Sequence, residues 1–139
     1  MKLPAFNGSP LKKWNTSQLL LRALRGAESE RAKTKLDYLH DLDFKGCTSC
    51  FACKWTRGKS YGHCAVNDDL QPIFEKIENA DGILIESPIY LGIKNGVTRC
   101  FLEYGSSTRT LSTMRNYPHG LRKRSRLHSS TSPGQRMSW

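Results

Sequence analysis

The chain has 139 residues, which is enough for one domain, and a low hydrophobic content of 37%. Its mean hydropathy is −0.56, no apolar run reaches the length of a membrane span, and the N-terminus turns polar too early for a secretory signal, so we expect a cytoplasmic protein with no membrane partner. The net charge of +10 is uneven, because residues 105–139 hold seven basic residues and no acidic ones.

The first predicted elements are a strand, a polar loop and a helix. Residues 3–6 favour a short buried strand, although Pro4 cannot donate to a sheet ladder. A basic loop follows, and from about residue 16 to residue 30 the apolar residues recur on one face of a helix. This order points backbone N–H groups into the loop, where phosphate is the usual occupant. The alternative is an ordinary turn with Asn15 or Thr16 as the N-cap.

The remaining elements alternate between strands and helices. In chain order they are expected at residues 33–39 (strand), 70–77 (helix), 82–86 (strand) and 96–104 (helix). The buried stripe of the first of these helices is expected at Leu70, Ile73, Phe74 and Ile77, and one apolar side of the second at Val97, Cys100, Phe101 and Tyr104. The strand at 82–86 is a continuous aliphatic run, which is typical of a strand covered on both faces. Strands that alternate with helices predict a parallel α/β sheet with right-handed crossovers.

A loop between the second strand and the next helix carries a cysteine set: Cys47, Cys50, Cys53 and Cys64. Thiolates at this spacing suit an iron–sulfur cluster. Zinc, with His63 as a substitute ligand, and a loop of thiols that binds no metal are the alternatives. Cys100 lies on the apolar face of the last predicted helix and is expected to be a core thiol.

A second loop follows the strand at residues 82–86 and begins with a turn at Ser87-Pro88. In an open parallel sheet, ligands bind outside the carboxyl ends of the strands, where the first loop also lies. Tyr90 offers a face for stacking on a flat ring, and Gly92 lets backbone N–H groups approach one. Two loops at one edge favour a nucleotide-sized site over a turn packed on itself.

These loops and the cysteines together resemble a known family. The matching motifs are Ala5-Phe6-Asn7-Gly8-Ser9-Pro10 with Asn15-Thr16, Gly46-Cys47-x2-Cys50-Phe51-Ala52-Cys53, Cys64-x3-Asp68-Asp69, and Ser87-Pro88-Ile89-Tyr90. Over about residues 1–103 the chain resembles the flavodoxin-like NAD(P)H-dependent FMN reductases and, within them, the iron–sulfur flavoprotein branch. The resemblance implies a doubly wound parallel sheet of five strands and bound FMN.

The resemblance also implies site residues. The FMN phosphate would be held by Ser9, Asn15, Thr16 and Ser17. The isoalloxazine ring would be lined by Pro88, Ile89, Tyr90 and Gly92. A 4Fe-4S cluster would be bound by Cys47, Cys50, Cys53 and Cys64.

The family further implies NAD(P)H as co-substrate, an electron acceptor that the sequence does not name, and a homo-oligomer. The redox chemistry would belong to the flavin, and the protein would bind, orient and tune it. Trp14 stands where the family usually has glycine before Asn-Thr. A bulky side chain there would block φ > 0 or crowd the phosphate, so we expect Trp14→Gly to strengthen FMN binding.

The family's sequence continues with two more strands where this chain becomes polar. We therefore expect an incomplete sheet of three of the five strands in a domain at residues 1–104, followed by a disordered basic tail at 105–139. Two alternative functions remain. One is a nucleic-acid-binding module that uses the basic run at 122–126, against which a solvated tail is the preferred interpretation. The other is a zinc-stabilised structural fragment.

Overall fold

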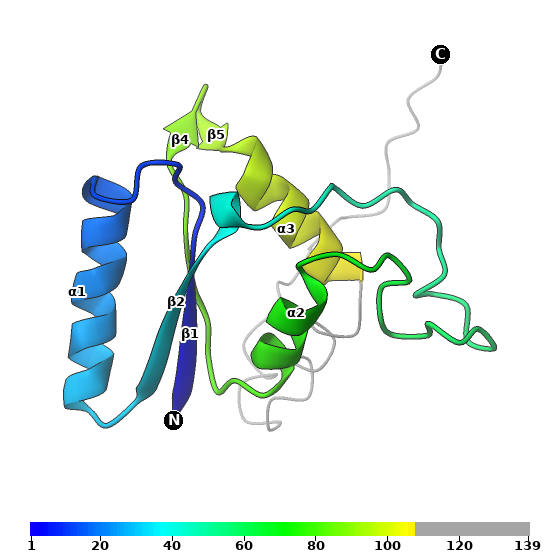
Figure 1. Cartoon of the computed structure of the whole chain (residues 1–139), viewed down its shortest axis with the longest axis horizontal. Helices are drawn as coiled ribbons and strands as arrows, with labels where there is room; N and C mark the ends of the chain where they lie inside the picture. Colours follow the sequence, from blue (N-terminus) through cyan, green and yellow to red (C-terminus); the bar gives the residue numbers. More distant parts are fainter. Residues whose placement is uncertain (108–139) are drawn as a thin grey trace, which may run out of the picture.

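The centre of the fold is a parallel sheet with helices on both faces (Figure 1). The computed structural model describes residues 1–107, so the expected tail and its basic run lie, apart from residues 105–107, outside the described residues. The elements are β1 (Lys2–Asn7), α1 (Asn15–Ser29), β2 (Lys33–Tyr38), η1 (Leu39–Asp41), α2 (Gln71–Glu78), β3 (Leu84–Glu86), β4 (Ile89–Tyr90), β5 (Ile93–Lys94) and α3 (Gly96–Ser107). This arrangement confirms the predicted flavodoxin-like α/β fold.

The strand β1 lies between β2 and β3, in the order β2-β1-β3, and both pairings are parallel. Pro4 therefore occupies a central strand, where proline is usually excluded. The backbone N–H groups of Lys2 and Gly8 point toward the β3 side, and Pro4 has the same parity along the strand. Because pairing with β3 begins only at Ala5, the missing N–H of Pro4 leaves no ladder bond unmade.

The helix α1 covers one face of the sheet, and α2 and α3 cover the other (Figure 1). Beneath α1 a small cluster forms from Ala5, Leu20 and Leu24, with Leu36 and Leu84 packed against it. Because successive side chains of a strand point to opposite faces, the next residue of β1, Phe6, enters the second cluster. That cluster contains the predicted apolar stripe of α2: Leu70, Ile73, Phe74 and Ile77.

Aromatic rings join α3 to this second cluster. The ring of Phe101 lies 5.1 Å from that of Phe6 and stacks on Phe74, with centroids 5.9 Å apart. Tyr104 stacks on the same Phe74 ring at 5.5 Å. Offset aromatic contacts of this kind add to the burial energy, so they fix α3 against α2. Cys100 was expected in the core, but it is half-buried and lies outside this cluster.

The third strand and the segment after it differ from the prediction. Only Leu84–Glu86 pairs with β1, and its residues are half-buried, because no further strand covers β3 within residues 1–107. The predicted turn is followed by a hairpin, in which β4 pairs antiparallel with β5. Its two turn residues, Leu91 and Gly92, have φ of 51° and 80°, the pattern of a type I′ turn. Among the helices of residues 1–107, none combines the length and apolar character needed to cross a membrane.

Candidate functional site

The loop between β1 and α1, residues 8–14, is held by buried polar side chains. The Asn7 Nδ2 group donates to Ser17 Oγ at 2.7 Å, and Asn7 Oδ1 accepts from the Ser9 backbone N–H at 2.7 Å. The Ser9 hydroxyl accepts from the Leu11 N–H at 3.1 Å. The Ser17 hydroxyl donates to the Leu11 carbonyl at 3.3 Å. Ser9 and Ser17 are both buried, so their hydroxyls hold the loop from within the fold.

The N-terminus of α1 faces this loop without a side-chain cap. Trp14 occupies the N-cap position and makes no capping hydrogen bond, and the first turn of α1 has no acidic residue. The N–H groups of the first helical residues, Asn15, Thr16 and Ser17, have no partner within an α-helix. Asn15 is exposed and Thr16 half-buried, so both side chains reach the surface beside these donors. The arrangement suits an anion, because the helix dipole is positive at this end.

Trp14 does not show the backbone strain that the sequence suggested. Its φ is −95° and its ψ is −175°, an extended conformation open to any residue, and its side chain is 65% exposed. The expectation of a bulky residue at a position that needs φ > 0 is therefore wrong. Near it, Lys12 forms an ion pair with Asp41 of η1 at 2.6 Å and lies 5.2 Å from the centre of the Tyr38 ring.

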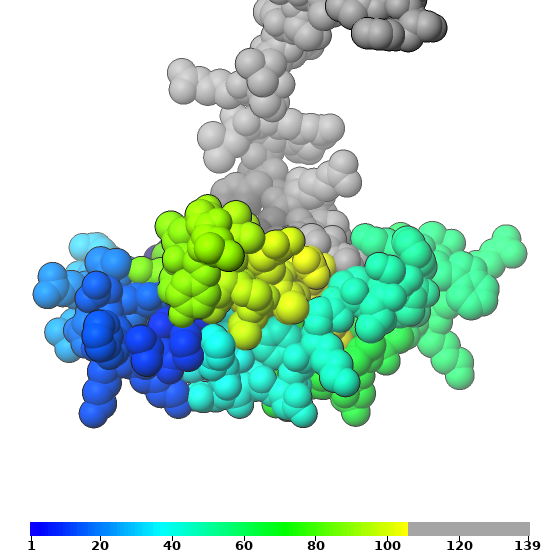
Figure 2. Space-filling view, turned by 90° about the horizontal axis from the view of Figure 1, so that it is seen from above, coloured from blue at the N-terminus to red at the C-terminus, as the bar shows by residue number. Residues whose placement is uncertain are grey.

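The hairpin β4–β5 lies at the same edge of the sheet, next to the β1–α1 loop when seen from above (Figure 2). Its apolar side chains are unusually exposed, with Ile89 at 75% and Tyr90 at 52%. Pro88 is half-buried, and Gly92 is exposed at the turn. Leu91 places a fully exposed side chain beside Gly92 at a positive φ. An exposed apolar surface of this kind beside a polar loop is typical of a ligand site.

Asn95 joins the two loops. Its side chain is buried, and its Nδ2 group donates to the Gly8 carbonyl at 2.5 Å. Its backbone N–H donates to Ser87 Oγ at 3.1 Å, and its Oδ1 accepts from the Thr98 N–H at 3.1 Å, which caps α3. The His40 Nε2 atom of η1 lies 3.1 Å from the same Gly8 oxygen. One residue, Asn95, thus connects the β1–α1 loop, the start of the hairpin segment and α3.

Gly8 is required where this loop meets α3. A Cβ at Gly8 would lie 1.9 Å from Thr98 Oγ1 and 3.1 Å from the Glu86 carbonyl oxygen. The Gly8 N–H donates to that carbonyl at 2.8 Å, so the backbone cannot move away without losing a hydrogen bond. The Thr98 hydroxyl is buried, and within residues 1–107 its oxygen has no hydrogen-bond partner.

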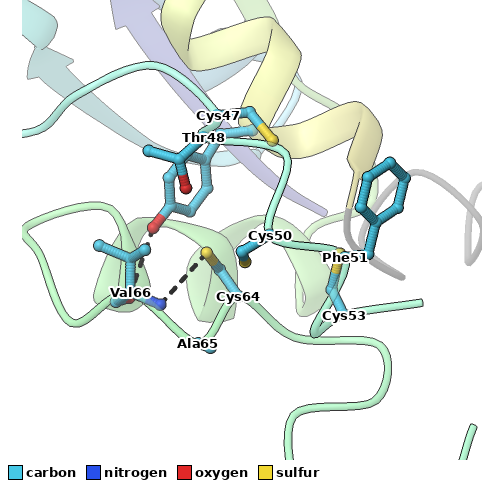
Figure 3. A pocket seen from close by; sticks show the side chains of 9 residues that line it. Cys47, Thr48, Cys50, Phe51, Cys53, Cys64, Ala65 and Val66 are labelled. Carbon is cyan, nitrogen blue, oxygen red and sulfur yellow. Dashed lines mark hydrogen bonds between the residues drawn. The ribbon is translucent and has the colours of Figure 1, made fainter. Parts of the chain in front are cut away.

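The cysteine loop, residues 42–70, contains no helix or strand and brings four thiols around one hollow. Two stretches of this loop face each other across it, one with Cys47, Cys50 and Cys53 and the other with Cys64 (Figure 3). Its volume is about 20 Å³, room for a water molecule. All five cysteines are thiols. No group of three His, Cys, Asp or Glu side chains in the described part of the chain is close enough to hold a metal ion.

Tyr104 of α3 forms one wall of this hollow. Its hydroxyl donates to the Val66 carbonyl at 3.4 Å, and the Val66 N–H donates to Cys64 Sγ at 3.4 Å. Burial raises the pKa of Tyr104 far above its usual value, with Cys64 and Asp68 adding to the effect, so the phenol stays protonated. Asp68 Oδ1 accepts from the Leu70 N–H, while its buried Oδ2 has no partner within the described residues.

Comparison with known proteins identifies the family. The model of the NADPH-dependent FMN reductases matches residues 1–136, beyond the residues 1–103 that carry the motifs. The chain belongs to this family. Its relatives include an iron–sulfur flavoprotein of Methanocaldococcus jannaschii, 35% identical over 92 residues that make up 66% of this chain and 45% of the relative. An iron–sulfur flavoprotein of Archaeoglobus fulgidus is 33% identical over 103 residues, 74% of this chain and 48% of the relative.

A third relative, the iron–sulfur flavoprotein of Methanosarcina thermophila, is 30% identical over 92 residues, 66% of this chain and 46% of the relative. This FMN reductase family member spans about half the length of the curated relatives it matches. The match explains why polar loops gather at the carboxyl edge of the sheet, where open α/β folds bind ligands.

The sequence indicated most residues of this edge but missed the ones that connect it. Asn7, Gly8 and Asn95 lie at the contacts between segments. Asn7 and Gly8 were noted only as part of the loop motif, and Asn95 was not singled out. Tyr104 was assigned only to the apolar face of α3, although it also borders the cysteines. An N-cap Asn directly before a predicted helix was the available signal for Asn95.

Proposed function

We propose that this chain binds FMN at the carboxyl edge of its sheet and acts as an NAD(P)H-dependent flavin oxidoreductase. The observation that carries the proposal is the junction at Asn95, which holds the anion-binding end of α1 and the apolar hairpin β4–β5 at one edge. FMN has the same two parts, an anionic phosphate and a flat apolar ring. The donors and the apolar surface that the chain presents therefore fit the group that its family name implies.

Within this proposal the phosphate contacts come from the exposed end of α1. Asn15 and Thr16 offer side-chain donors next to the first N–H groups of the helix, and Lys13 adds positive charge nearby. Ser9 and Ser17, which the resemblance gives to the phosphate, act here through the loop that their hydroxyls hold in place.

The ring would lie against the hairpin segment. Pro88, Ile89 and Tyr90 supply apolar contact area, and Gly92 leaves its side of the turn open to a close approach. Bound FMN supplies the transfer of an electron pair from a nicotinamide nucleotide and its release to an acceptor. The hairpin would exclude water from one side of the ring and fix its orientation.

Titration of FMN into the purified chain, followed by quenching of flavin fluorescence, tests the proposal. We expect saturable binding, and bleaching of the bound flavin's visible band by NADPH or NADH without oxygen. Thr16→Ala should weaken FMN binding about tenfold and riboflavin binding far less, because one phosphate hydrogen bond is lost. Ser29→Ala, which removes a hydroxyl from the far end of the same helix, is the matched control. A folded chain that does not bind FMN would refute the proposal.

We further propose that the cysteine loop holds an iron–sulfur cluster on Cys47, Cys50, Cys53 and Cys64. Four thiols around one hollow are the donor set that such clusters use, and the relatives carry the name iron–sulfur flavoprotein. The hollow is smaller than a cluster, so the sulfurs would have to rearrange around it. The loop has no helix or strand to resist that rearrangement.

Iron and acid-labile sulfide content, measured after anaerobic reconstitution, tests this second proposal. Cys64→Ser is expected to lose the iron and the broad visible absorption. Cys100→Ser is the matched control, because Cys100 is also half-buried but does not line the hollow. Equal iron loss in both variants, or zinc retained in place of iron after purification, would contradict the assignment.

A further inference from the structure

A second pocket is lined by residues at the start of β1. This end of the sheet lies opposite the hairpin β4–β5 (Figure 1). It is bounded by β1, β2 and α2 and has a volume of about 590 Å³, within the range of small-molecule sites. We call it the lysine pocket, after the charged residues that line it: Lys2, Lys33, Lys35, Lys76 and Glu75.

Positive charge predominates in the lysine pocket. Lys76 is engaged by Asp37, whose two carboxylate oxygens lie 3.0 and 3.1 Å from its Nζ atom. The remaining charges are three exposed lysines, Lys2, Lys33 and Lys35, against the single carboxylate of Glu75. A concave site with one dominant sign of charge concentrates ligands of the opposite sign.

The residue pattern along β2 makes the face of this strand that borders the lysine pocket polar. Thr34 donates to Glu28 of α1 and Leu36 packs against the α1 cluster, so these two residues face α1. Lys33 and Lys35 alternate with them and therefore face the α2 side. An ordinary sheet face under a helix would carry apolar residues there, as β1 does at Phe6.

The helix α2 leaves the lysine end of the sheet open. Its eight residues place Ile73, Phe74 and Ile77 in the core cluster around Phe6. Pro72, Glu75, Lys76 and Asn79 then form the wall of the pocket, and β1 borders it at Leu3 and Pro4, of which Pro4 is buried. The pocket therefore combines apolar walls with a rim of ammonium groups.

We propose that the lysine pocket binds a phosphorylated organic anion of nucleotide size, at a site separate from the flavin site. Lysine ammonium groups bind phosphate oxygens as point charges, and the apolar surface of the exposed Pro72 and of the lysine stems accepts the organic part. The inference goes beyond the proposed function, because it involves neither the β1–α1 loop nor the hairpin. A nucleoside diphosphate such as ADP is a suitable probe.

Calorimetric titration of ADP into the full chain, at fixed ionic strength and both with and without one equivalent of FMN, tests the proposal. We expect saturable ADP binding that FMN does not displace. The double variant Lys33→Gln/Lys35→Gln should lose at least about tenfold in ADP affinity, as expected when two charge contacts are removed. The control Lys54→Gln/Lys59→Gln removes the same charge from exposed positions of the cysteine loop and should stay within about twofold of wild type.

Competition experiments and the variants together decide the result. Pyrophosphate should compete with ADP, whereas adenosine should not, because the ammonium groups recognise phosphate. ADP that fails to bind, that is displaced by FMN, or that binds Lys33→Gln/Lys35→Gln as tightly as wild type would overturn the proposal. Circular dichroism confirms that the variants are folded, and Lys2→Gln provides a second lesion in the pocket if the double variant is not. FMN binding and ADP binding are measured in separate titrations, so failure of one proposal can be distinguished from failure of the other.

Discussion

The side chain of Asn95 donates to the carbonyl oxygen of Gly8 at 2.5 Å, across 87 positions of sequence. The bond is buried, and it joins the end of β1 to the start of α3. Gly8 opens the loop that faces the N-terminus of α1, and Asn95 follows the hairpin. The relative position of the two halves of the proposed flavin site therefore depends on this contact.

Two replacements of Asn95 are expected to distinguish its contact with Gly8, which positions the loop, from its capping of α3. Asn95→Ser keeps an N-cap oxygen for the Thr98 N–H but cannot reach Gly8, so FMN affinity should fall while much of the stability remains. Asn95→Ala removes both contacts and should cost about 1–3 kcal/mol of unfolding free energy. Flavin fluorescence and urea denaturation measure the two effects.

Asn79→Ala is the control for this pair of variants. Asn79 is exposed and donates to the Glu75 carbonyl within one turn of α2, so its loss should change stability by less than about 0.5 kcal/mol. If Asn95→Ser binds FMN as tightly as wild type, the contact with Gly8 does not position the flavin site.

Gly8→Ala is expected to destabilise the fold by about 1–3 kcal/mol, because its Cβ would overlap Thr98 Oγ1 at 1.9 Å. The double variant Gly8→Ala/Thr98→Ala should recover part of that loss, since the closest atom is removed. Gly26→Ala is the matched control. A Cβ at Gly26 meets nothing within 4 Å, and alanine inside α1 should stabilise by about 0.5–1 kcal/mol. Thermal unfolding of the three variants measures this order of stability. A Gly8→Ala variant as stable as wild type would contradict the prediction.

Glu86→Gln is expected to raise stability at neutral pH. Burial raises the pKa of Glu86 above its usual value, so the folded chain holds this proton more tightly than the unfolded chain does. The favourable contribution of the protonated form is complete below the unfolded pKa and is lost as pH rises through the folded pKa. At pH 7 the ionised side chain therefore opposes folding.

The pH dependence of the difference is the measurement. The melting temperature of Glu86→Gln should exceed that of wild type at about pH 7, and the gain should shrink toward about pH 4, near the usual pKa of glutamate. Glu30→Gln, at an exposed position after α1, is the control for loss of one carboxylate. A gain that is the same at both pH values would show that ionisation of Glu86 is not its cause.

Local sequence patterns predicted the helices and strands well, because the burial of one face determines the spacing of apolar residues within each element. The stripe Leu70, Ile73, Phe74 and Ile77 was predicted as buried and is buried, since a helical period of apolar residues has one way to reach the core. The hairpin was not predicted. Its type I′ turn usually carries Asn-Gly, and Leu91-Gly92 lacks the first of these two residues.

The strand register and the individual hydrogen bonds between segments could not be predicted from the sequence. The placement of Pro4 in a central strand became acceptable only because β3 begins one residue later in the register, which no local pattern encodes. The hydrogen bonds of Ser9 and Ser17 within the loop could not be predicted from the sequence for a similar reason, and their contact with the phosphate stays a prediction. Both hydroxyls are used by Leu11 N–H and carbonyl groups inside the loop, which the sequence could not distinguish from phosphate contacts.

Trp14 gives the sharpest test of the loop. Its backbone is extended and its side chain exposed, so Trp14→Gly should leave FMN affinity within about twofold of wild type, contrary to the expectation from the family's glycine. Trp14→Ser should act differently. A serine at the N-cap accepts from the N–H groups of Thr16 or Ser17 and should stabilise α1 by about 0.5–1 kcal/mol.

Those N–H groups are the ones proposed to meet the FMN phosphate. Trp14→Ser is therefore expected to raise the melting temperature of the FMN-free chain while weakening FMN binding, a combination that a general gain in stability would not produce. Parallel melting curves and FMN titrations of wild type, Trp14→Gly and Trp14→Ser measure both quantities. Stronger FMN binding by Trp14→Gly would show that the indole obstructs the phosphate. Unchanged FMN binding by a stabilised Trp14→Ser would place the phosphate away from the N-terminus of α1.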